Sequence, residues 1–389
     1  MMIISIFLFT LSLSGILLIF LFDPILVCIG YLTKRKKVIT YPPIRPSVSL
    51  LIVVRNAENL IVDKIKNSLS IHYPSDDYEI VIFSDGSTDG TEDKIKFFPD
   101  KRIRFLSSPV HEGKNSGINK AIPYCTGEII VFSDVDAIID KDAIIHLTKY
   151  FSDPEVGGVC GNIHEKAKDV QSNYVTVKSV IKRLENQIVS TTSNKGKLYA
   201  VRKSLFPVIP LQAIDDLYVC LSVVHQKYKF LFAPEANAFS KTFPKNSIHE
   251  IKRRRRTIIG SLCAVSMVEE LLNPFKFGIF SIRLILNKIM KRLLAAFLLF
   301  LFFSSLYLSP FCYAAKILMI AQTSFYMLAL SYRIVFQYTP GSNVIKEVTS
   351  VVYYFCIGTY GNLIGVLDFI MGKQIVKWEP LNTDVSSMK

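Results

Sequence analysis

Long apolar runs with few charged residues lie toward both ends of the chain, and a charged stretch with regular apolar patterning lies between them. The first run, 1–22, matches the length of about 20 apolar residues that crosses a bilayer, and a second apolar stretch continues to Leu32. We interpret 1–32 as a transmembrane anchor, because a cleaved signal peptide would have a basic start, a shorter apolar core and a small-residue cleavage site. The basic cluster at 34–37 follows directly, which predicts a cytoplasmic domain after the anchor.

Three further apolar segments lie within 293–371, and the tail 372–389 follows them; the segments are 293–309, 311–332 and 348–371. We therefore expect four membrane-embedded segments in all. The last of them contains small and polar residues, namely Gly358, Gly361, Asn362, Gly365 and Asp368. A membrane helix accepts such groups where they face other protein or a water-lined cavity, so we expect this segment to pack against its neighbours.

The region 261–292, just before these segments, has the pattern of an amphipathic interfacial region. Phe277, Phe280 and Leu284 recur at helical spacing, and charged residues such as Arg283 fall on another face. The alternative is an ordinary surface helix packed on the preceding domain.

Between the apolar ends, short runs rich in Val, Ile, Leu and Phe alternate with helical patterns. The candidate strands are 49–54, 79–83, 103–106, 128–132 and 157–160, and the candidate helices are 57–70, 89–97, 114–122 and 141–151. This alternation predicts an α/β domain with a mainly parallel sheet covered by helices, which we place at 47–260. We interpret its less regular part, 162–260, as an acceptor-side surface. Ligands in such folds gather at the carboxyl ends of the strands, where this chain has polar clusters.

Composition narrows the class of protein. Apolar residues make up 50% of the chain, which excludes a disordered protein. The formal net charge is +14, and the excess of Lys and Arg gathers beside the apolar runs, which favours an anionic membrane surface or a phosphorylated substrate over nucleic acid. The seven cysteines form no C-x-x-C pair, a pattern typical of a reducing compartment.

Two carboxylates, Asp134 and Asp136, follow the candidate strand 128–132 directly. At the carboxyl end of a strand, this D-x-D pattern can bind a hard divalent cation together with phosphate oxygens. The alternative is a solvated acidic loop.

The segment 84–91, with the sequence Ser-Asp-Gly-Ser-Thr-Asp-Gly-Thr, stands at a strand-to-helix junction. Its glycines permit a tight turn, and Thr88 or Asp89 can cap the next helix, so a capped turn is one interpretation. Asp85 closes the strand instead, and its carboxylate can accept hydrogen bonds from a nucleotide base or ribose. The segment 111–114 is not a Walker A loop, and the chain has neither a G-x-G-x-x-G nor an H-E-x-x-H pattern.

An ordered set of motifs runs through most of the chain. It consists of Arg55-Asn56-x-Glu58, the 84–91 segment, Gly113-Lys114, Asp134-x-Asp136, Gly196 with Ala200-Val201-Arg202, Asp215-Asp216 and Arg253-x-x-Arg256. In this order the motifs resemble the family 2 glycosyltransferases of the GT-A fold. More narrowly they resemble the membrane-bound, processive-type members, a group that includes cellulose, chitin, hyaluronan and poly-N-acetylglucosamine synthases. The segment 376–380, Val-Lys-Trp-Glu-Pro, is similar to the tail of many such proteins.

The resemblance implies which residues contact a nucleotide-sugar donor: Asn56, Glu58, Asp85, Lys114, Asp134, Arg253 and Arg256. Lys114 is expected at the base or a phosphate. Arg253 and Arg256 are three positions apart, so they fall on one helix face and suit bidentate binding of a pyrophosphate. A membrane-surface patch is the alternative interpretation of the four-arginine run.

The resemblance also implies a metal site and a catalytic base. Asp134 and Asp136 are expected to bind Mg²⁺ or Mn²⁺, with Asp136 as the direct ligand. Asp215 and Asp216 stand where the family has an acidic pair, whose second carboxylate, Asp216, is the general base; an acidic pair on a surface helix is the alternative. One base suffices for a single displacement with inversion, and a cation with positioned Lys or Arg stabilises the leaving diphosphate.

The chain departs from the family at one motif. Synthases with long products often have Q-x-x-R-W, where this chain has Arg-Arg-Arg-Arg-Thr at 253–257. In the family the tryptophan borders the acceptor sugar. Thr257 in its place weakens the expectation of a processive synthase with a cellulose-, chitin- or hyaluronan-type product.

The sequence therefore predicts a multi-pass cell-membrane glycosyltransferase with a cytoplasmic catalytic domain. It is expected to transfer a sugar from a nucleotide sugar to a glycan or lipid-linked acceptor in surface polysaccharide biosynthesis, with membrane lipids but no nucleic acid as partners. The alternative within the enzyme class is single-sugar transfer to a polyprenyl phosphate or other lipid. From another class, the chain would be a non-catalytic sugar-nucleotide-binding or transport subunit, which the intact Asp85, Asp136 and Asp216 argue against.

Overall fold

The structure is a computed structural model that describes residues 1–22, 24–25, 41–165, 190–194, 196–240, 247–336 and 344–373. The chain divides into two compact units. The first consists of Met1–Leu26, Pro244–Leu262 and Ile282–Gln374, and the second contains Val27–Phe243 and Cys263–Ser281. The basic cluster at 34–37 and the tail motif at 376–380 lie outside the described residues.

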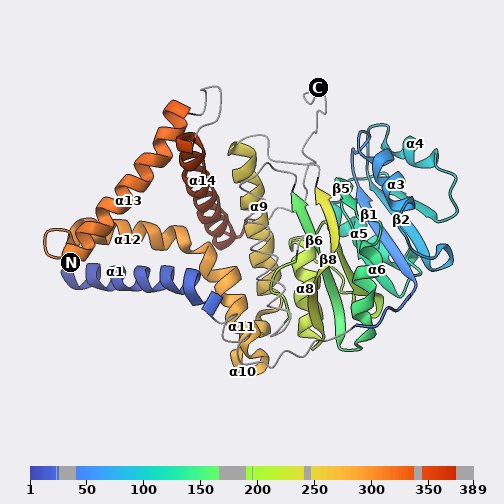
Figure 1. The fold of residues 1–389 in the computed structure, drawn as a ribbon, viewed down its shortest axis with the longest axis horizontal. Helices are drawn as coiled ribbons and strands as arrows, with labels where there is room; N and C mark the ends of the chain where they lie inside the picture. The colour runs from blue at the N-terminus through green and yellow to red at the C-terminus, as the bar shows by residue number, and fades with distance from the viewer. Residues whose placement is uncertain are drawn as a thin grey trace. The chain divides into compact units, whose positions relative to one another are not determined.

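The second unit is built on one eight-stranded sheet with the order β3-β2-β1-β4-β7-β6-β8-β5 (Figure 1). The strands are β1 (Val48–Val54), β2 (Tyr78–Asp85), β3 (Ile103–Ser108), β4 (Ile129–Phe132), β5 (Ala137–Ile139), β6 (Val156–Glu165), β7 (Tyr199–Arg202) and β8 (Lys229–Ser240). β1 runs parallel to β2 and β4, as do β2 to β3 and β6 to β8, whereas β7 is antiparallel to both neighbours and β5 to β8. The predicted α/β domain with a mainly parallel sheet is confirmed.

Helices alternate with the first strands as predicted. They are α3 (Ile61–Leu69), α4 (Thr91–Lys96), α5 (Lys114–Ala121) and α6 (Ala143–Thr148), each inside a predicted helix, and α8 (Asp215–His225) follows β7. Three strands, β5, β7 and β8, are not among those predicted. β5 has only three residues, and β8 contains Pro234 and three alanines where a run of β-branched residues would have signalled a strand.

The core of this sheet sets the position of the site. Fully buried side chains of the central strands include Leu50, Ile52, Ile80, Ile82 and Val131. The register pairs Val54 with Ser84 and Leu51 with Phe132, so the carboxyl ends of the parallel strands β1, β2 and β4 lie on the same side of the sheet, here called its carboxyl edge. Polar residues that follow these strands therefore meet at that edge.

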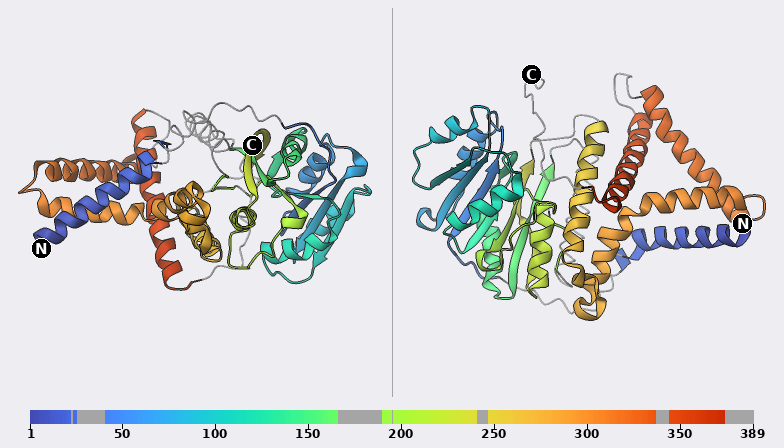
Figure 2. Two further views of the ribbon diagram at one scale, coloured as in Figure 1. Left: turned by 90° about the horizontal axis from the view of Figure 1, so that it is seen from below. Right: turned by 180° about the vertical axis from the view of Figure 1, so that it is seen from behind.

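The first unit consists of apolar helices and α9 (Ser247–Ser266). The apolar helices are α1 (Met2–Leu17), α12 (Leu294–Leu308), α13 (Tyr313–Ser331) and α14 (Val344–Ile370). Among the described residues, Met2–Phe22, Tyr313–Phe336 and Val344–Ile370 are long and apolar enough to cross a membrane. A fourth candidate is Ile279–Arg292 together with Leu294–Leu308, two helices bent by 58°. α1 packs along α12 (Figure 2).

Glycines on α14 allow α9 to approach it closely. A Cβ added at Gly358 would lie 2.8 Å from the guanidinium carbon of Arg254, and one at Gly365 would lie 2.8 Å from Cβ of Ile258. Larger side chains at these positions would separate the two helices. The predicted packing of these small residues against protein is confirmed.

Asp368 is the acidic residue within the apolar run of α14. Its side chain is 2% exposed and forms ion pairs with Arg255 of α9 and with Lys373, the latter at 2.8 Å. The two cations satisfy a carboxylate that an apolar helix could not otherwise bury, as we expected for this position.

The predicted interfacial region forms two short helices, α10 (Pro274–Phe277) and α11 (Ile279–Leu284). Arg283, which we expected on a polar face, is only 1% exposed, and Phe280 and Leu284 are buried with it. The predicted division into a polar and an apolar face is therefore wrong at Arg283. The physical reason is spacing within α11: Arg283 follows Phe280 by three positions and directly precedes Leu284, so it falls beside these apolar side chains and not opposite them.

Candidate active site

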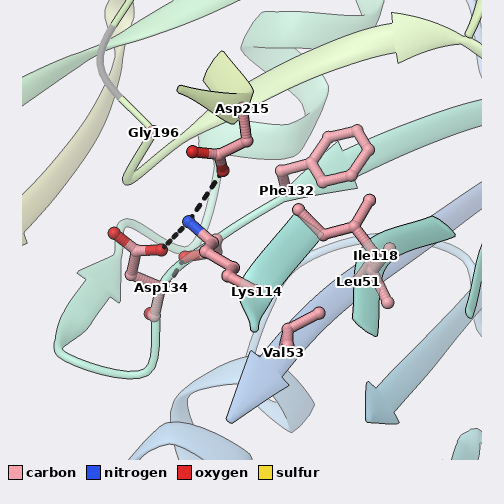
Figure 3. A pocket seen from close by; sticks show the side chains of 9 residues that line it. Leu51, Val53, Lys114, Ile118, Phe132, Asp134, Gly196 and Asp215 are labelled. Carbon is pink, nitrogen blue, oxygen red and sulfur yellow. Dashed lines mark hydrogen bonds and ion pairs between the residues drawn. The ribbon is translucent and has the colours of Figure 1, made fainter. Parts of the chain in front are cut away.

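A pocket opens at the sheet edge where β1 and β4 end (Figure 3). Leu51, Val53, Ile118 and Phe132 form its apolar walls, and its polar lining consists of Lys114, Ser133, Asp134, Gly196 and Asp215. These residues come from β1 and β4, α5, the turn after β4, the residues before β7 and the start of α8. The pocket thus collects several of the predicted site residues from distant parts of the chain.

Lys114 is the central cation of this pocket. Its Nζ lies 2.8 Å from Oδ1 of Asp134 and 2.8 Å from Oδ2 of Asp215, as Figure 3 shows. Burial alone would lower the pKa of Lys114, but the charges of Asp134 and Asp215, with their hydrogen bonds, outweigh it and raise the pKa above its usual range. The residue predicted as a donor contact therefore stays charged and connects the D-x-D turn to the acidic pair.

The second carboxylate of the D-x-D turn, Asp136, is paired with Lys197. Nζ of Lys197 lies 2.6 Å from Oδ2 of Asp136 and also donates a hydrogen bond to Oγ of Ser240. The described part of the chain contains no group of three or more His, Cys, Asp or Glu placed to bind a metal ion. Asp134 and Asp136 remain the residues whose hard carboxylate oxygens suit Mg²⁺ or Mn²⁺, because these ions are commonly bound by one or two carboxylates, with phosphates and water as the other ligands.

Lys64 binds the residues on either side of the D-x-D turn, and it is not among the site residues that we predicted. Its side chain is fully buried, and Nζ donates hydrogen bonds to Oγ of Ser133 at 2.7 Å and to the carbonyl oxygen of Ala137 at 2.6 Å. These two residues flank Asp134–Asp136. Lys64 lies on the buried face of α3 with Ile61 and Ile65, and this helical spacing is the signal by which the sequence could have shown it.

We predict that Lys64 makes stability depend on pH. Burial lowers the pKa of Lys64 to about 7, although the charges of Asp134 and Asp136 oppose the shift. In the unfolded chain a lysine titrates near about 10.4, so between about 7 and 10.4 the unfolded chain binds more protons than the folded one. The free energy of unfolding therefore rises with pH in this window, by up to about 1.4 kcal/mol per pH unit.

Thermal unfolding of the wild type and of Lys64→Met, followed from pH 7 to pH 9 in detergent, measures this effect. The difference between their midpoints should change in favour of the wild type as the pH rises. A pH-independent difference would contradict the assignment.

Asp85 ends β2 and organises the segment before α5. The carboxylate is buried and accepts hydrogen bonds from Nδ1 of His111 at 2.8 Å, from the backbone N–H of Glu112 at 2.9 Å and from that of Gly113 at 2.8 Å. Gly113 adopts a φ of 106°, which favours glycine, and α5 begins at the next residue. Asp85 thus fixes the start of the helix that carries Lys114, and its contact with a nucleotide stays a prediction.

Asn56 and Glu58 also hold the 84–91 segment. Oδ1 of Asn56 accepts a hydrogen bond from the backbone N–H of Thr88 at 2.8 Å. Oε2 of Glu58 accepts a hydrogen bond from the backbone N–H of Gly90 at 3.4 Å, and the same carboxylate pairs with Lys94 of α4 at 3.1 Å. The structure brings these two motifs together, and their predicted contact with a nucleotide is not tested by it.

The two acidic residues that begin α8 have different surroundings. Asp215 pairs with Lys114, whereas Oδ1 of Asp216 accepts a hydrogen bond from the backbone N–H of Leu217 at 2.7 Å. A Cβ added at Gly196 would lie 3.4 Å from Oδ2 of Asp216, so this carboxylate faces a glycine that also lines the pocket. Asp215 lines the pocket, Asp216 follows it in the first turn of α8, and the catalytic role of the pair stays a prediction.

Arg253 and Arg256 lie on α9, which belongs to the first unit. Their neighbours Arg254 and Arg255 contact Gly358 and Asp368 of α14, as described above. Pyrophosphate binding by Arg253 and Arg256 stays a prediction.

The fold is that of a GT-A-like domain, and comparison with known proteins agrees. A mannosyltransferase from Pyrobaculum calidifontis, solved in complex with GDP-Man and Mn²⁺, has the same fold with a TM-score of 0.66, covering 94% of this chain and 100% of that one at 18% identity. Residues 49–203 match the family described as Glycosyl transferase family 2. This part of the chain is therefore similar to the glycosyltransferases of family 2.

Curated relatives match part of the chain. The chain is 30% identical to a Nostoc beta-monoglucosyldiacylglycerol synthase over 135 residues, 34% of this chain and 28% of the relative. It is 28% identical to the Staphylococcus epidermidis poly-beta-1,6-N-acetyl-D-glucosamine synthase over 165 residues, 40% of each chain. The matches therefore span less than half the length of these relatives.

Proposed function

We propose that the protein is a membrane-bound inverting glycosyltransferase. It transfers a sugar from a nucleotide-sugar donor to a glycan or lipid-linked acceptor at the cytoplasmic face of the cell membrane, in the synthesis of a surface polysaccharide. The family 2 domain and the candidate membrane helices support this proposal. The names of the relatives, a glycolipid synthase and a polysaccharide synthase, support the choice of acceptor class.

The observation that carries the proposal is the bridge made by Lys114. It joins Asp134 of the D-x-D turn to Asp215 beside Asp216, at the carboxyl edge of the parallel strands. A donor bound over this carboxyl edge would have its diphosphate near the acidic turn and its sugar near the acidic pair. That order is what displacement at the anomeric carbon requires.

The leaving diphosphate would be stabilised by two sources of positive charge. Asp134 and Asp136 would hold Mg²⁺ or Mn²⁺, which when bound supplies positive charge to the leaving diphosphate. Lys114 is a fixed cation at the same place, where it adds to the stabilisation of the developing negative charge.

Asp216 acts as the general base in this proposal. The acceptor hydroxyl oxygen bonds to the anomeric carbon, its proton passes to the Asp216 carboxylate, and the bond to the diphosphate oxygen breaks with its electron pair on the leaving group.

A panel of sugar nucleotides tests the proposal. UDP- and GDP-sugars, each with and without Mg²⁺ or Mn²⁺, should include one that raises the unfolding temperature, because a ligand at 100 times its Kd stabilises by about 2.7 kcal/mol. The same donor, radiolabelled, should yield a labelled product in membranes, and the length of that product separates polymer synthesis from single transfer to a lipid. Neither stabilisation nor transfer with any donor would instead favour a non-catalytic subunit.

A further inference from the structure

Two asparagines of α5 bind the backbone that leads into the acidic pair. Nδ2 of Asn115 lies 2.8 Å from the carbonyl oxygen of Pro210 and 2.8 Å from that of Ala213. One turn further along, Asn119 donates from Nδ2 to the carbonyl oxygen of Ile209 at 2.8 Å, and its Oδ1 accepts the N–H of Ile209 at 2.9 Å. The side chains of one helix therefore hold the segment 209–213, two residues before Asp215.

This segment depends on such contacts. Val208 and Leu211 are 80% and 43% exposed, whereas Ile209 and Ala213 are buried, so burial holds the two ends of the segment and leaves its middle to hydrogen bonds. The N–H of Ala213 donates to the carbonyl oxygen of Pro210 at 3.2 Å, which closes a turn around the atoms that Asn115 binds. The hydrogen bonds from α5 thus fix a turn whose side chains point outward at two positions.

The same helix also carries Lys114, the cation bound to Asp215. α5 therefore positions the acidic pair in two ways. Lys114 pairs with Asp215, and Asn115 and Asn119 bind the backbone that precedes the pair. Because Asp216 follows Asp215 in the first turn of α8, any shift of the segment 209–213 moves its carboxylate.

We propose that Asn115 and Asn119 are positioning residues that hold Asp216 in place for proton transfer. The inference rests on the proposed function, because it takes Asp216 to be the general base. Neither residue need touch a substrate, because each acts through the segment 209–213. Misplacement of a catalytic group by about 1 Å can cost about 10²-fold in rate, so the expected loss is in kcat.

The chemistry of the amide gives an ordered set of variants at position 115. Asn115→Ala removes the amide group whose two N–H bonds serve the carbonyl oxygens of Pro210 and Ala213, and leaves these carbonyls to water. Asn115→Asp instead places an anion against the same two carbonyl oxygens, which repel it. We therefore expect kcat to fall in the order wild type, Asn115→Ala, Asn115→Asp, by about 10-fold to 10²-fold overall, with the KM for the donor changed less than about threefold.

Gln226 provides the matched control. Its Nε2 lies 3.0 Å from the carbonyl oxygen of Leu205, so it is also an amide that holds the segment before α8, but from the far end of that helix. Gln226→Ala should leave kcat within about twofold of the wild type, because Asp216 lies at the opposite end of α8.

Hydrogen exchange separates this inference from the proposed function. In Asn115→Ala and Asn119→Ala, amides of peptides covering 206–217 should exchange faster than in the wild type and in Gln226→Ala, whatever the activity. Unchanged exchange would overturn the inference, as would faster exchange with unchanged kcat. A wild type that transfers no sugar from any donor would overturn the proposed function, and with it the role of Asp216, while exchange still decides whether the asparagines hold the segment.

Discussion

Asp216→Asn is expected to lower kcat by about 10² or more while leaving donor binding intact. The substitution keeps the size of the side chain and an oxygen that can accept the N–H of Leu217. It removes the carboxylate that accepts the proton of the attacking hydroxyl. Thermal stabilisation by the donor reports binding, and initial rates with the same donor report turnover.

Asp215→Asn is the matched comparison, because it neutralises the adjacent carboxylate. It weakens the ion pair with Lys114, so we expect a loss of stability and a higher KM for the donor, with a smaller effect on kcat. Normal turnover in Asp216→Asn together with inactivity in Asp215→Asn would show that the other carboxylate is the base.

The strands of the parallel half of the sheet could be predicted because they are short, apolar and β-branched. β1 and β4 are buried on both faces, so their sequences read as continuous apolar runs. β7 and β8 could not be predicted in this way. β7 has only four residues. β8 is stabilised as a strand by its pairing with β6, and this contact joins segments about 70 residues apart, which no local sequence pattern shows.

The candidate site divides in the same way. The acidic residues at 134, 136, 215 and 216 are prominent in the sequence, because they stand in two close pairs, one directly after an apolar strand and one in an ordered set of motifs. Their counter-ions and supports were not predicted. Lys197 and Lys64 reach the acidic turn from 61 and more residues away, and Asn115 bonds to a carbonyl 95 residues distant.

Those supports change what the site can do. With Lys114 at Asp134 and Lys197 at Asp136, each carboxylate of the D-x-D turn has a lysine within 2.8 Å. A divalent cation that binds at the turn competes with these lysines for the two carboxylates. Its measured affinity therefore depends on how strongly the lysines hold the carboxylates. The metal prediction can accordingly be tested by binding as well as by activity.

Asp136→Ala is expected to abolish transfer and to lower the affinity for Mn²⁺ by at least about tenfold, while the protein stays folded. Asp136 lies in a turn at the sheet edge and not in the core, so its loss removes a ligand and an ion pair without creating a cavity in the packed sheet. Electron paramagnetic resonance of free Mn²⁺ measures binding with no need for turnover, and thermal unfolding measures the fold.

Asp142→Ala provides the control for this last prediction. Asp142 is an acidic residue on the next loop, where its exposed carboxylate pairs with His72 at 2.9 Å, so the variant makes the same charge change without touching the D-x-D turn. It should bind Mn²⁺ and transfer sugar as the wild type does. Full activity in Asp136→Ala would remove the D-x-D turn from the mechanism. Loss of activity with unchanged Mn²⁺ binding would show that Asp136 contacts the donor and is not a ligand of the metal.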